Sequence, residues 1–281
     1  MTVSMRVMSA GDGYKYLLRT VAAADGNRPL STPLTRYYME EGTPPGRWLG
    51  AGVAALGKGE IQVGDRESED QLQLLMGKGC DPITGDKLGL GFPAYKSQDE
   101  RIEARIAALG QTLTPGAKGE AVAQIVAEET ARSTRRAVAG FDFTFSIPKS
   151  TSVLWAVADA GVQALIGEAH HRAVAEVVAF MEREVAATRT GATAGDGAVA
   201  QVEVTGLIAT AFDHFDSRAG DPHLHTHVVI SNKVKTDFDG KWRSLDGRPM
   251  HAAVVALSEL HEAVFADHMT RTFGVSWEAR E

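Results

Sequence analysis

Apolar and polar residues alternate most clearly in two stretches of the chain. Residues 141–146 (FDFTFS) place phenylalanine at every second position, with polar residues between them, and residues 2–9 (TVSMRVMS) alternate in a similar way. A period of two is typical of a strand with one buried face, so the pattern predicts strands over both ranges. A further strand is expected over 198–212, after a Gly-rich turn.

Other segments show helical spacing or a composition typical of turns. The expected helices cover 13–24, 47–58, 68–77, 98–110, 117–137, 161–187 and 250–273. Glycine, proline and small polar residues predict loops or turns at 25–46, 77–89 and 191–197, and Asp239-Gly240 predicts a hairpin. Strands grouped between helices, without a regular strand–helix–strand repeat, predict an α+β fold with a central antiparallel β-sheet flanked by helices.

Composition restricts the class of protein. The 281 residues are 44% hydrophobic, enough for one large or two small domains with a sizeable core. No apolar run approaches the ~20 residues of a membrane span and no signal peptide is visible, so we expect a cytoplasmic protein without membrane insertion. The single cysteine, Cys80, excludes an intramolecular disulfide. A net charge of −7 argues against non-specific coating of nucleic acid, although residues 1–58 carry seven Lys and Arg against four Asp and Glu.

Four of the nine histidines lie between residues 214 and 227. His225 and His227 are two residues apart, so in a strand both side chains point to the same face. His214 lies eleven residues earlier, and the turn between could return the chain beside it. Two antiparallel strands would then bring three imidazoles together, a donor set that suits a divalent metal. His223 has the same parity but follows Pro222, so it is expected at the start of the strand.

Each of these residues also has an ordinary structural interpretation. Histidines are common as polar surface or core residues, but burying adjacent imidazoles without a partner is costly, which favours the metal site. Asp142 lies on the polar face of its strand and could orient a ligand imidazole by accepting its second N–H. From this strand alone, a solvated aspartate is the simpler interpretation.

Three motifs resemble the MobF-type conjugative relaxases, the HUH nicking enzymes that start plasmid transfer. HFDSRAGDPHLHTHVVISN (214–232) resembles their three-histidine motif, and GFDFTFSIPKSTSV (140–153) resembles their aspartate strand. PPGRWLGAGVAALG (44–57) resembles their Gly/Trp segment. The resemblance covers essentially the whole chain and implies the HUH relaxase palm, a central antiparallel sheet flanked by helices.

The resemblance also implies a reaction. The family cuts one DNA strand at the origin of transfer, joins a tyrosine to the 5′ phosphate and religates the strand when transfer ends. It implies a divalent ion on His214, His225 and His227, with Mg²⁺ or Mn²⁺ expected and Zn²⁺ as the alternative. Asp142 would orient a ligand or accept a proton. The implied partners are single-stranded origin-of-transfer DNA, accessory relaxosome proteins and a coupling protein.

Family members carry their catalytic tyrosines near the N-terminus, commonly as two pairs. Four of the five tyrosines here match that location: Tyr14, Tyr16, Tyr37 and Tyr38. The first pair is split, and aligning the family's SAG motif favours Tyr16, whereas anchoring on Gly13 favours Tyr14. The helix at 13–24 follows a strand that we expect at the centre of the sheet. Tyr37 and Tyr38 lie in a Gly/Pro-rich stretch that suits a second nucleophile, the one that ends transfer.

Phosphate contacts are expected from Arg218, Lys149 and Arg36, each of which could instead be an ordinary exposed cation. Two other functions use the same histidines. One is a metal-dependent phosphodiester hydrolase with metal-bound water as nucleophile, and the other is a non-catalytic DNA-binding module. The family usually fuses this domain to a helicase, but the chain has no G-x-x-x-x-G-K-[ST] motif. Residues 1–281 are therefore predicted to be a relaxase domain, with the helicase part absent from this chain.

Overall fold

The computed structural model describes residues 2–18, 44–109, 114–132, 135–191, 199–217 and 219–278. The chain forms two compact units. The larger unit comprises Met1–Gly91 and Val138–Glu281, and the smaller comprises Phe92–Ala137. No helix in these described ranges is long and apolar enough to cross a membrane.

The larger unit is built on a five-stranded antiparallel sheet in the order β1-β3-β7-β6-β2. Its strands are β1 (Val3–Ser9), β2 (Arg47–Leu49), β3 (Val138–Ser146), β6 (Ala209–Asp216) and β7 (Pro222–Ser231). This confirms the α+β fold with a central antiparallel sheet and the strands predicted over 2–9 and 141–146. The central position expected for the first strand is wrong, because β7 is the central strand, flanked by β3 and β6, and β1 is an edge strand. Its exposed Arg6 and Val7 are compatible with an edge.

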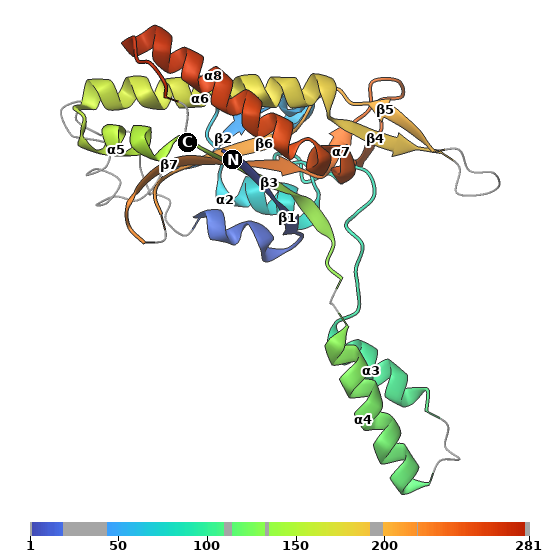
Figure 1. Ribbon diagram of the computed structural model, residues 1–281. Helices are drawn as coiled ribbons and strands as arrows, with labels where there is room; N and C mark the ends of the chain where they lie inside the picture. Colours follow the sequence, from blue (N-terminus) through green and yellow to red (C-terminus); the bar gives the residue numbers. More distant parts are fainter. Residues whose placement is uncertain are drawn as a thin grey trace. The chain divides into compact units, whose positions relative to one another are not determined.

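Helices α6 (Ala160–Glu184) and α8 (Val254–Phe273) cover one face of the sheet (Figure 1). The phenylalanines of β3 point to this face and form the main core with Val174, Val177 and other apolar residues. A second apolar cluster, which includes Trp155 of α5 (Lys149–Val157), continues the core toward the start of β7. The alternation of β3 therefore follows directly from one face packed against helices.

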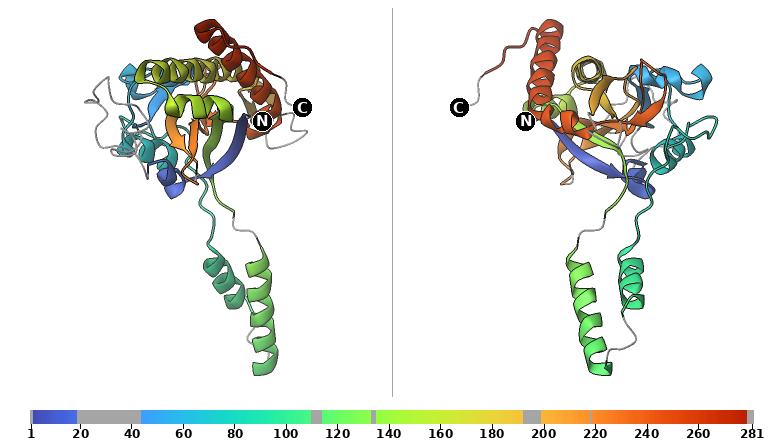
Figure 2. Two further views of the ribbon diagram at one scale, coloured as in Figure 1. Left: turned by 60° about the vertical axis from the view of Figure 1, so that its left-hand side comes forward. Right: turned by 90° about the vertical axis from the view of Figure 1, so that its right-hand side faces the viewer.

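The opposite face is covered in part by η1 (Asp12–Leu18), a 3₁₀-helix, and by α2 (Glu69–Leu72), which runs into the π-helix η4 (Gln73–Lys78) (Figures 1 and 2). A methyl group at Gly140 of β3 would come within 2.8 Å of Met76 Cε, so η4 lies directly on the sheet. A methyl group at Gly77 would lie 3.7 Å from Tyr14 Cε1, so η1 packs on η4 in turn. The helix that carries the first tyrosines thus lies on the polar face of β3.

Two predicted elements are wrong for a shared reason. The helix expected over 47–58 is instead β2 followed by two 3₁₀ turns, η2 (Ala51–Ala55) and η3 (Gly57–Gly59). The strand expected over 198–212 is divided into β5 (Ala200–Glu203) and β6. Gly206 has φ +147° in the gap, and a Cβ there would lie 2.5 Å from Gly52 N of η2. The two segments meet backbone to backbone, which neither a continuous helix nor a continuous strand would allow.

The remaining elements agree with the sequence apart from their ends. β4 (Ala187–Thr190) pairs with β5, and β8 (Lys233–Lys235) pairs with β9 (Trp242–Ser244) in the hairpin predicted at Asp239-Gly240. The helix expected over 250–273 is preceded by the short α7 (Gly247–Ala252). The first helix is described only as η1, and residues 19–43 lie outside the described part of the chain.

The smaller unit is a pair of helices, α3 (Gln98–Ala107) and α4 (Pro115–Ala131). Both were predicted, and both start at a side-chain cap, Ser97 or Thr114. Arg101 Nε donates to Glu129 Oε2 at 2.7 Å, and Arg105 Nη1 donates to Glu129 Oε1 at 3.1 Å. These ion pairs hold α3 against α4.

Candidate active site

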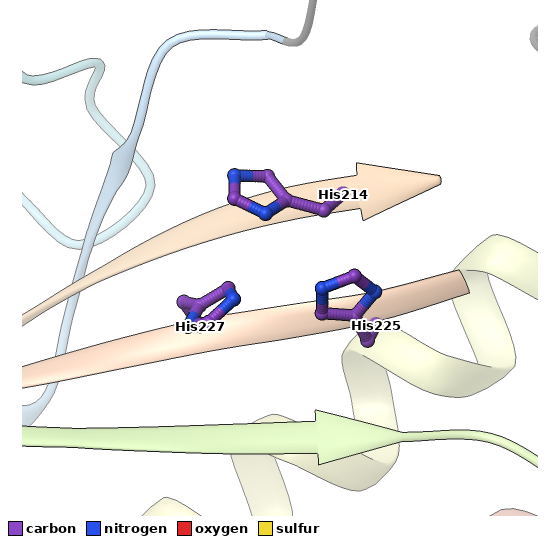
Figure 3. A group of neighbouring side chains, drawn as sticks. All are labelled: His214, His225 and His227. Atoms are coloured by element: carbon purple, nitrogen blue, oxygen red, sulfur yellow. The ribbon is translucent and has the colours of Figure 1, made fainter. Parts of the chain in front are cut away.

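Three imidazoles converge on two neighbouring strands (Figure 3). His214 of β6 is the register partner of His225 of β7, and His227 follows two residues later on the same face. One ring nitrogen from each histidine lies within 4.8 Å of the other two. Within the described ranges, these residues form the one group of three or more potential metal ligands at such distances. The convergence expected from the His-x-His spacing and the returning turn is confirmed.

Hydrogen bonds determine which nitrogens remain available. His225 Nδ1 lies 2.8 Å from the carbonyl oxygen of His223 and must donate, because a carbonyl only accepts. His227 Nδ1 lies 2.9 Å from Asp142 Oδ1 and donates to that carboxylate. In its neutral form, each ring therefore keeps the lone pair of Nε2. His214 Nε2 is buried and has no hydrogen-bond partner.

The chemistry of this donor set fits a divalent ion. Burial lowers the pKa of His214 and of His225 to about 4, so both rings are neutral near pH 7 and able to coordinate. A buried polar atom without a partner costs about 1–3 kcal/mol. A metal bound to His214 Nε2 would remove that cost, and the bond from His227 to Asp142 is the kind of contact that fixes a ligand imidazole.

Asp142 connects the histidines to a tyrosine. Its side chain is buried in β3, and the Tyr16 hydroxyl donates a hydrogen bond to Oδ2. The interpretation of Asp142 as a solvated residue, which the strand alone favoured, is therefore wrong. Burial raises the pKa of the Tyr16 hydroxyl, and the charge and hydrogen bond of Asp142 raise it further. The phenol is protonated at neutral pH, with its proton directed at a carboxylate.

The two tyrosines of η1 have different environments. Tyr14 is 1% exposed and packs into the core beside η4. Tyr16 is 37% exposed, and its ring meets the edge of the His227 ring at a centroid distance of 6.2 Å. Tyr16 thus combines access to solvent with a contact to the site, whereas Tyr14 has the environment of a core residue.

Comparison with known proteins decides the family. The family model described as TrwC relaxase matches residues 10–281. The chain belongs to the TrwC relaxase family. Relaxases are DNA-nicking enzymes, and the expectation of a relaxase fold is confirmed by solved structures. One is the conjugative relaxase TrwC in complex with oriT DNA and copper, with 25% identity, a TM-score of 0.59, and coverage of 96% of this chain and 71% of TrwC.

Other relatives agree. A metal-bound structure of TrwC with oriT DNA has a TM-score of 0.62 at 23% identity, covering 96% of this chain and 70% of that one. The multifunctional conjugation protein TraI of Escherichia coli is 38% identical over 106 residues. That match spans 38% of this relaxase chain but 6% of the length of TraI.

The other residues predicted for this relaxase have mixed outcomes. Lys149 forms an ion pair with Asp221 and donates to the carbonyl oxygen of Pro222 at 2.9 Å, so it braces the turn between the histidine strands. Its contact with DNA stays a prediction. The rest lie outside the described residues: Arg36, Tyr37, Tyr38 and Arg218.

Sequence reasoning missed one cation at the site. Arg6 of β1 is exposed and is the register partner of Asp142. Its positive charge lowers the pKa of Tyr16, against the larger effects of burial and Asp142. The alternation of polar and apolar residues over 2–9 could have drawn attention to Arg6. Its relation to Asp142, however, depends on how β1 pairs with β3, which local sequence patterns do not determine.

Proposed function

We propose that this relaxase cleaves one strand of origin-of-transfer DNA by attack of Tyr16 on a phosphate, and reseals the strand by the reverse reaction. One observation supports this most strongly. The Tyr16 hydroxyl, the Asp142 carboxylate and the three-histidine cluster form a continuous chain of two hydrogen bonds. These two hydrogen bonds therefore join a nucleophile, a proton acceptor and a metal site.

The proton transfer follows from the raised pKa of Tyr16. A neutral phenol is a weak nucleophile, so Asp142 accepts its proton as the phenolic oxygen attacks phosphorus. The bond from the Tyr16 oxygen to phosphorus forms, the bond from phosphorus to the 3′ oxygen breaks, and that oxygen takes up a proton through water, which is replaced when Asp142 releases the proton it accepted. The 5′ phosphate remains on Tyr16, and religation reverses each step. Arg6 lies where a cation would attract the phosphate.

We propose that His214, His225 and His227 hold one divalent ion through Nε2. Such an ion supplies Lewis-acid polarisation of a non-bridging phosphate oxygen when bound. Imidazole nitrogens suit Zn²⁺ and Cu²⁺, whereas Mg²⁺ and Mn²⁺ are usually bound by oxygen ligands. Zn²⁺, the alternative ion, therefore fits this all-nitrogen donor set best, and of the two ions expected first Mn²⁺ is the softer and tolerates nitrogen better than Mg²⁺.

The proposed substrate is single-stranded origin-of-transfer DNA, since the TrwC structures contain oriT DNA. Accessory relaxosome proteins and a coupling protein stay predictions from the family resemblance. The domain organisation, with residues 1–281 as the relaxase domain and a helicase part outside this chain, also stays a prediction. The hydrolase alternative uses the same histidines but gives no role to the bond between Tyr16 and Asp142.

The test is adduct formation by matched tyrosine variants. The parent protein is incubated with Mn²⁺ and a single-stranded origin oligonucleotide labelled at its 3′ end, and the products are separated on a denaturing protein gel. We expect the parent and Tyr14→Phe to carry the label and Tyr16→Phe to carry none. Adduct formation by Tyr16→Phe at the parent's level would contradict the assignment. Cleavage without any adduct would favour the hydrolase.

A further inference from the structure

A second polar network lies behind the histidine strands, on the face that packs against α6. Asp213 precedes His214 on β6, and Thr226 lies between His225 and His227 on β7. Asp213 and Thr226 are register partners, and Thr226 Oγ1 donates to Asp213 Oδ1 at 2.6 Å. Asp213 is 5% exposed and Thr226 is fully buried. One cross-strand bond thus joins the two segments that carry the proposed metal ligands.

Three further groups complete this network. Asp213 Oδ2 accepts from Arg47 Nη1 of β2 at 2.6 Å and lies 2.9 Å from His171 Nε2 of α6. Because the Thr226 hydroxyl proton goes to Asp213, its oxygen accepts from His170 Nε2 of α6 at 2.8 Å. The pair of strands is therefore held from behind by groups of β2 and α6.

Packing alone does not require these polar groups. The neighbouring register pairs on the same face are apolar, with Ala211 opposite Val228 and Ala209 opposite Ile230. Burying a carboxylate and a hydroxyl is costly unless both are fully bonded, and an apolar pair would avoid that cost. The polar pair occurs beside His214, His225 and His227, where the side chains of both strands must meet at one point.

We infer that Asp213 and Thr226 are positioning residues that fix β6 and β7 so that His214, His225 and His227 converge on a metal ion. The inference rests on the metal site of the proposed function. Both side chains lie on the face of the sheet opposite the three histidines, so both act through the backbone of the strands. Metal sites tolerate errors of only about 0.5 Å in ligand position, so a lost cross-strand bond should reduce affinity.

The test compares threonine variants that differ in one hydroxyl. Thr226→Val keeps the shape and removes the bond, and Thr226→Ser keeps the bond. Thr210→Val is the matched control, because Thr210 is a buried threonine of β6 whose hydroxyl has no hydrogen-bond partner. Mn²⁺ affinity is measured by calorimetry without DNA, and the visible spectrum of the Co²⁺-loaded protein reports the geometry of the site.

We expect Thr226→Val to bind Mn²⁺ about 10-fold more weakly, the lower end of the loss seen when a group bonded directly to a ligand is removed, because Thr226 acts through the strand and not through a bond to an imidazole. Its Co²⁺ spectrum should differ from the parent's, while Thr226→Ser and Thr210→Val match the parent in both measurements. If Thr226→Val does not fold, Asp213→Asn is tested in the same way, with the same expectation. Parent-like affinity and spectrum in the folded variant would overturn the inference.

The two proposals fail in different ways. A parent protein that binds Mn²⁺ but forms no DNA adduct contradicts the proposed function and leaves the positioning role intact. Adduct formation by the parent together with unchanged metal binding in Thr226→Val contradicts the positioning role alone. A parent whose metal binding is unaffected by His225→Ala would overturn both, because the ion would then bind elsewhere.

Discussion

Replacing Asp142 with asparagine tests the connection between the tyrosine and the metal site. The carboxylate accepts two hydrogen bonds, from His227 Nδ1 at 2.9 Å and from the Tyr16 hydroxyl. Asparagine has nearly the same shape but offers one oxygen and one NH₂ group, which only donates. With the asparagine oxygen accepting from His227 Nδ1, the NH₂ group can only donate to the Tyr16 oxygen, so the phenolic proton loses its acceptor and the side chain can no longer accept a proton.

The magnitude follows from those two contacts. Loss of a general base typically slows a reaction by about 10²–10⁴-fold, equivalent to about 3–5 kcal/mol in the barrier. Loss of the bond to a ligand imidazole typically reduces metal affinity by about 10–100-fold. We therefore expect Asp142→Asn to bind Mn²⁺ more weakly and, even with Mn²⁺ saturating, to form the adduct at least ~10²-fold more slowly.

A single-turnover experiment separates the two effects. Excess protein is mixed with labelled oligonucleotide over a series of Mn²⁺ concentrations at pH 7.5, and the adduct is quantified over time. Circular dichroism and DNA binding serve as controls for folding. A rate at saturating Mn²⁺ within about 3-fold of the parent's would refute the role of Asp142 as proton acceptor, and would leave it only the orientation of His227.

Three further predictions concern the metal, the charge near the nucleophile and the response to pH. Chelation with EDTA should abolish adduct formation, and added Mn²⁺ should restore it in the parent but not in His214→Ala; full activity after exhaustive chelation would contradict a metal role. Arg6→Gln should slow adduct formation by about 10-fold with unchanged Mn²⁺ affinity, because Arg6 carries a positive charge beside Tyr16 but does not contact the histidines; an unchanged rate would remove Arg6 from the site. Burial lowers the pKa of His261 to about 4. In the unfolded chain the pKa of His261 is near 6.5, so the unfolded state binds the proton first as the pH falls. The stability that the neutral ring contributes above pH 6.5 is therefore lost as the pH falls toward 4. The loss between pH 7.5 and pH 5 is about 2 kcal/mol. The free energy of unfolding of His261→Phe, measured with urea at both pH values, should fall by about 2 kcal/mol less than the parent's. An equal fall in both proteins would show that His261 does not cause it.

The predictions that depended on the period of two in β3 and β7 were reliable, whereas the helix over 47–58 and the single strand over 198–212, also drawn from local pattern, were wrong. A strand directs residues i and i+2 to one face whatever surrounds it, so His225 with His227 follows from spacing alone. The same rule separates Asp142 from the phenylalanines of β3. The returning turn between His214 and His225 needed only two neighbouring strands, which the sheet provides.

The properties that depended on pairing between distant segments could not be derived this way. Burial of Asp142 results from η1, more than a hundred residues earlier, lying on β3. The relation of Arg6 to Asp142 depends on the register of β1 with β3, and the bond between Asp213 and Thr226 on that of β6 with β7. The choice between Tyr14 and Tyr16 needed both the 3₁₀ geometry of η1 and the position of η1 on the sheet, because together these direct one tyrosine to Asp142 and the other to η4.

The most direct test of the account is to identify the tyrosine that carries the DNA. The trapped adduct is treated with nuclease and trypsin, and its peptides are sequenced by tandem mass spectrometry. Cleavage after Arg6, Lys15 and Arg19 separates Tyr14 in peptide 7–15 from Tyr16 in peptide 16–19. Cleavage after Arg36 and Arg47 places Tyr37 and Tyr38 in peptide 37–47.

We expect the nucleotide-modified residue to be Tyr16, either in peptide 16–19 or, where the modification blocks cleavage after Lys15, in peptide 7–19 with fragment ions that assign it. The same digest of Tyr14→Phe should give the same modified residue. Modification of Tyr14, or of Tyr37 or Tyr38 with Tyr16 always unmodified, would contradict the account, because the bond between Tyr16 and Asp142 would then have no part in the first cleavage.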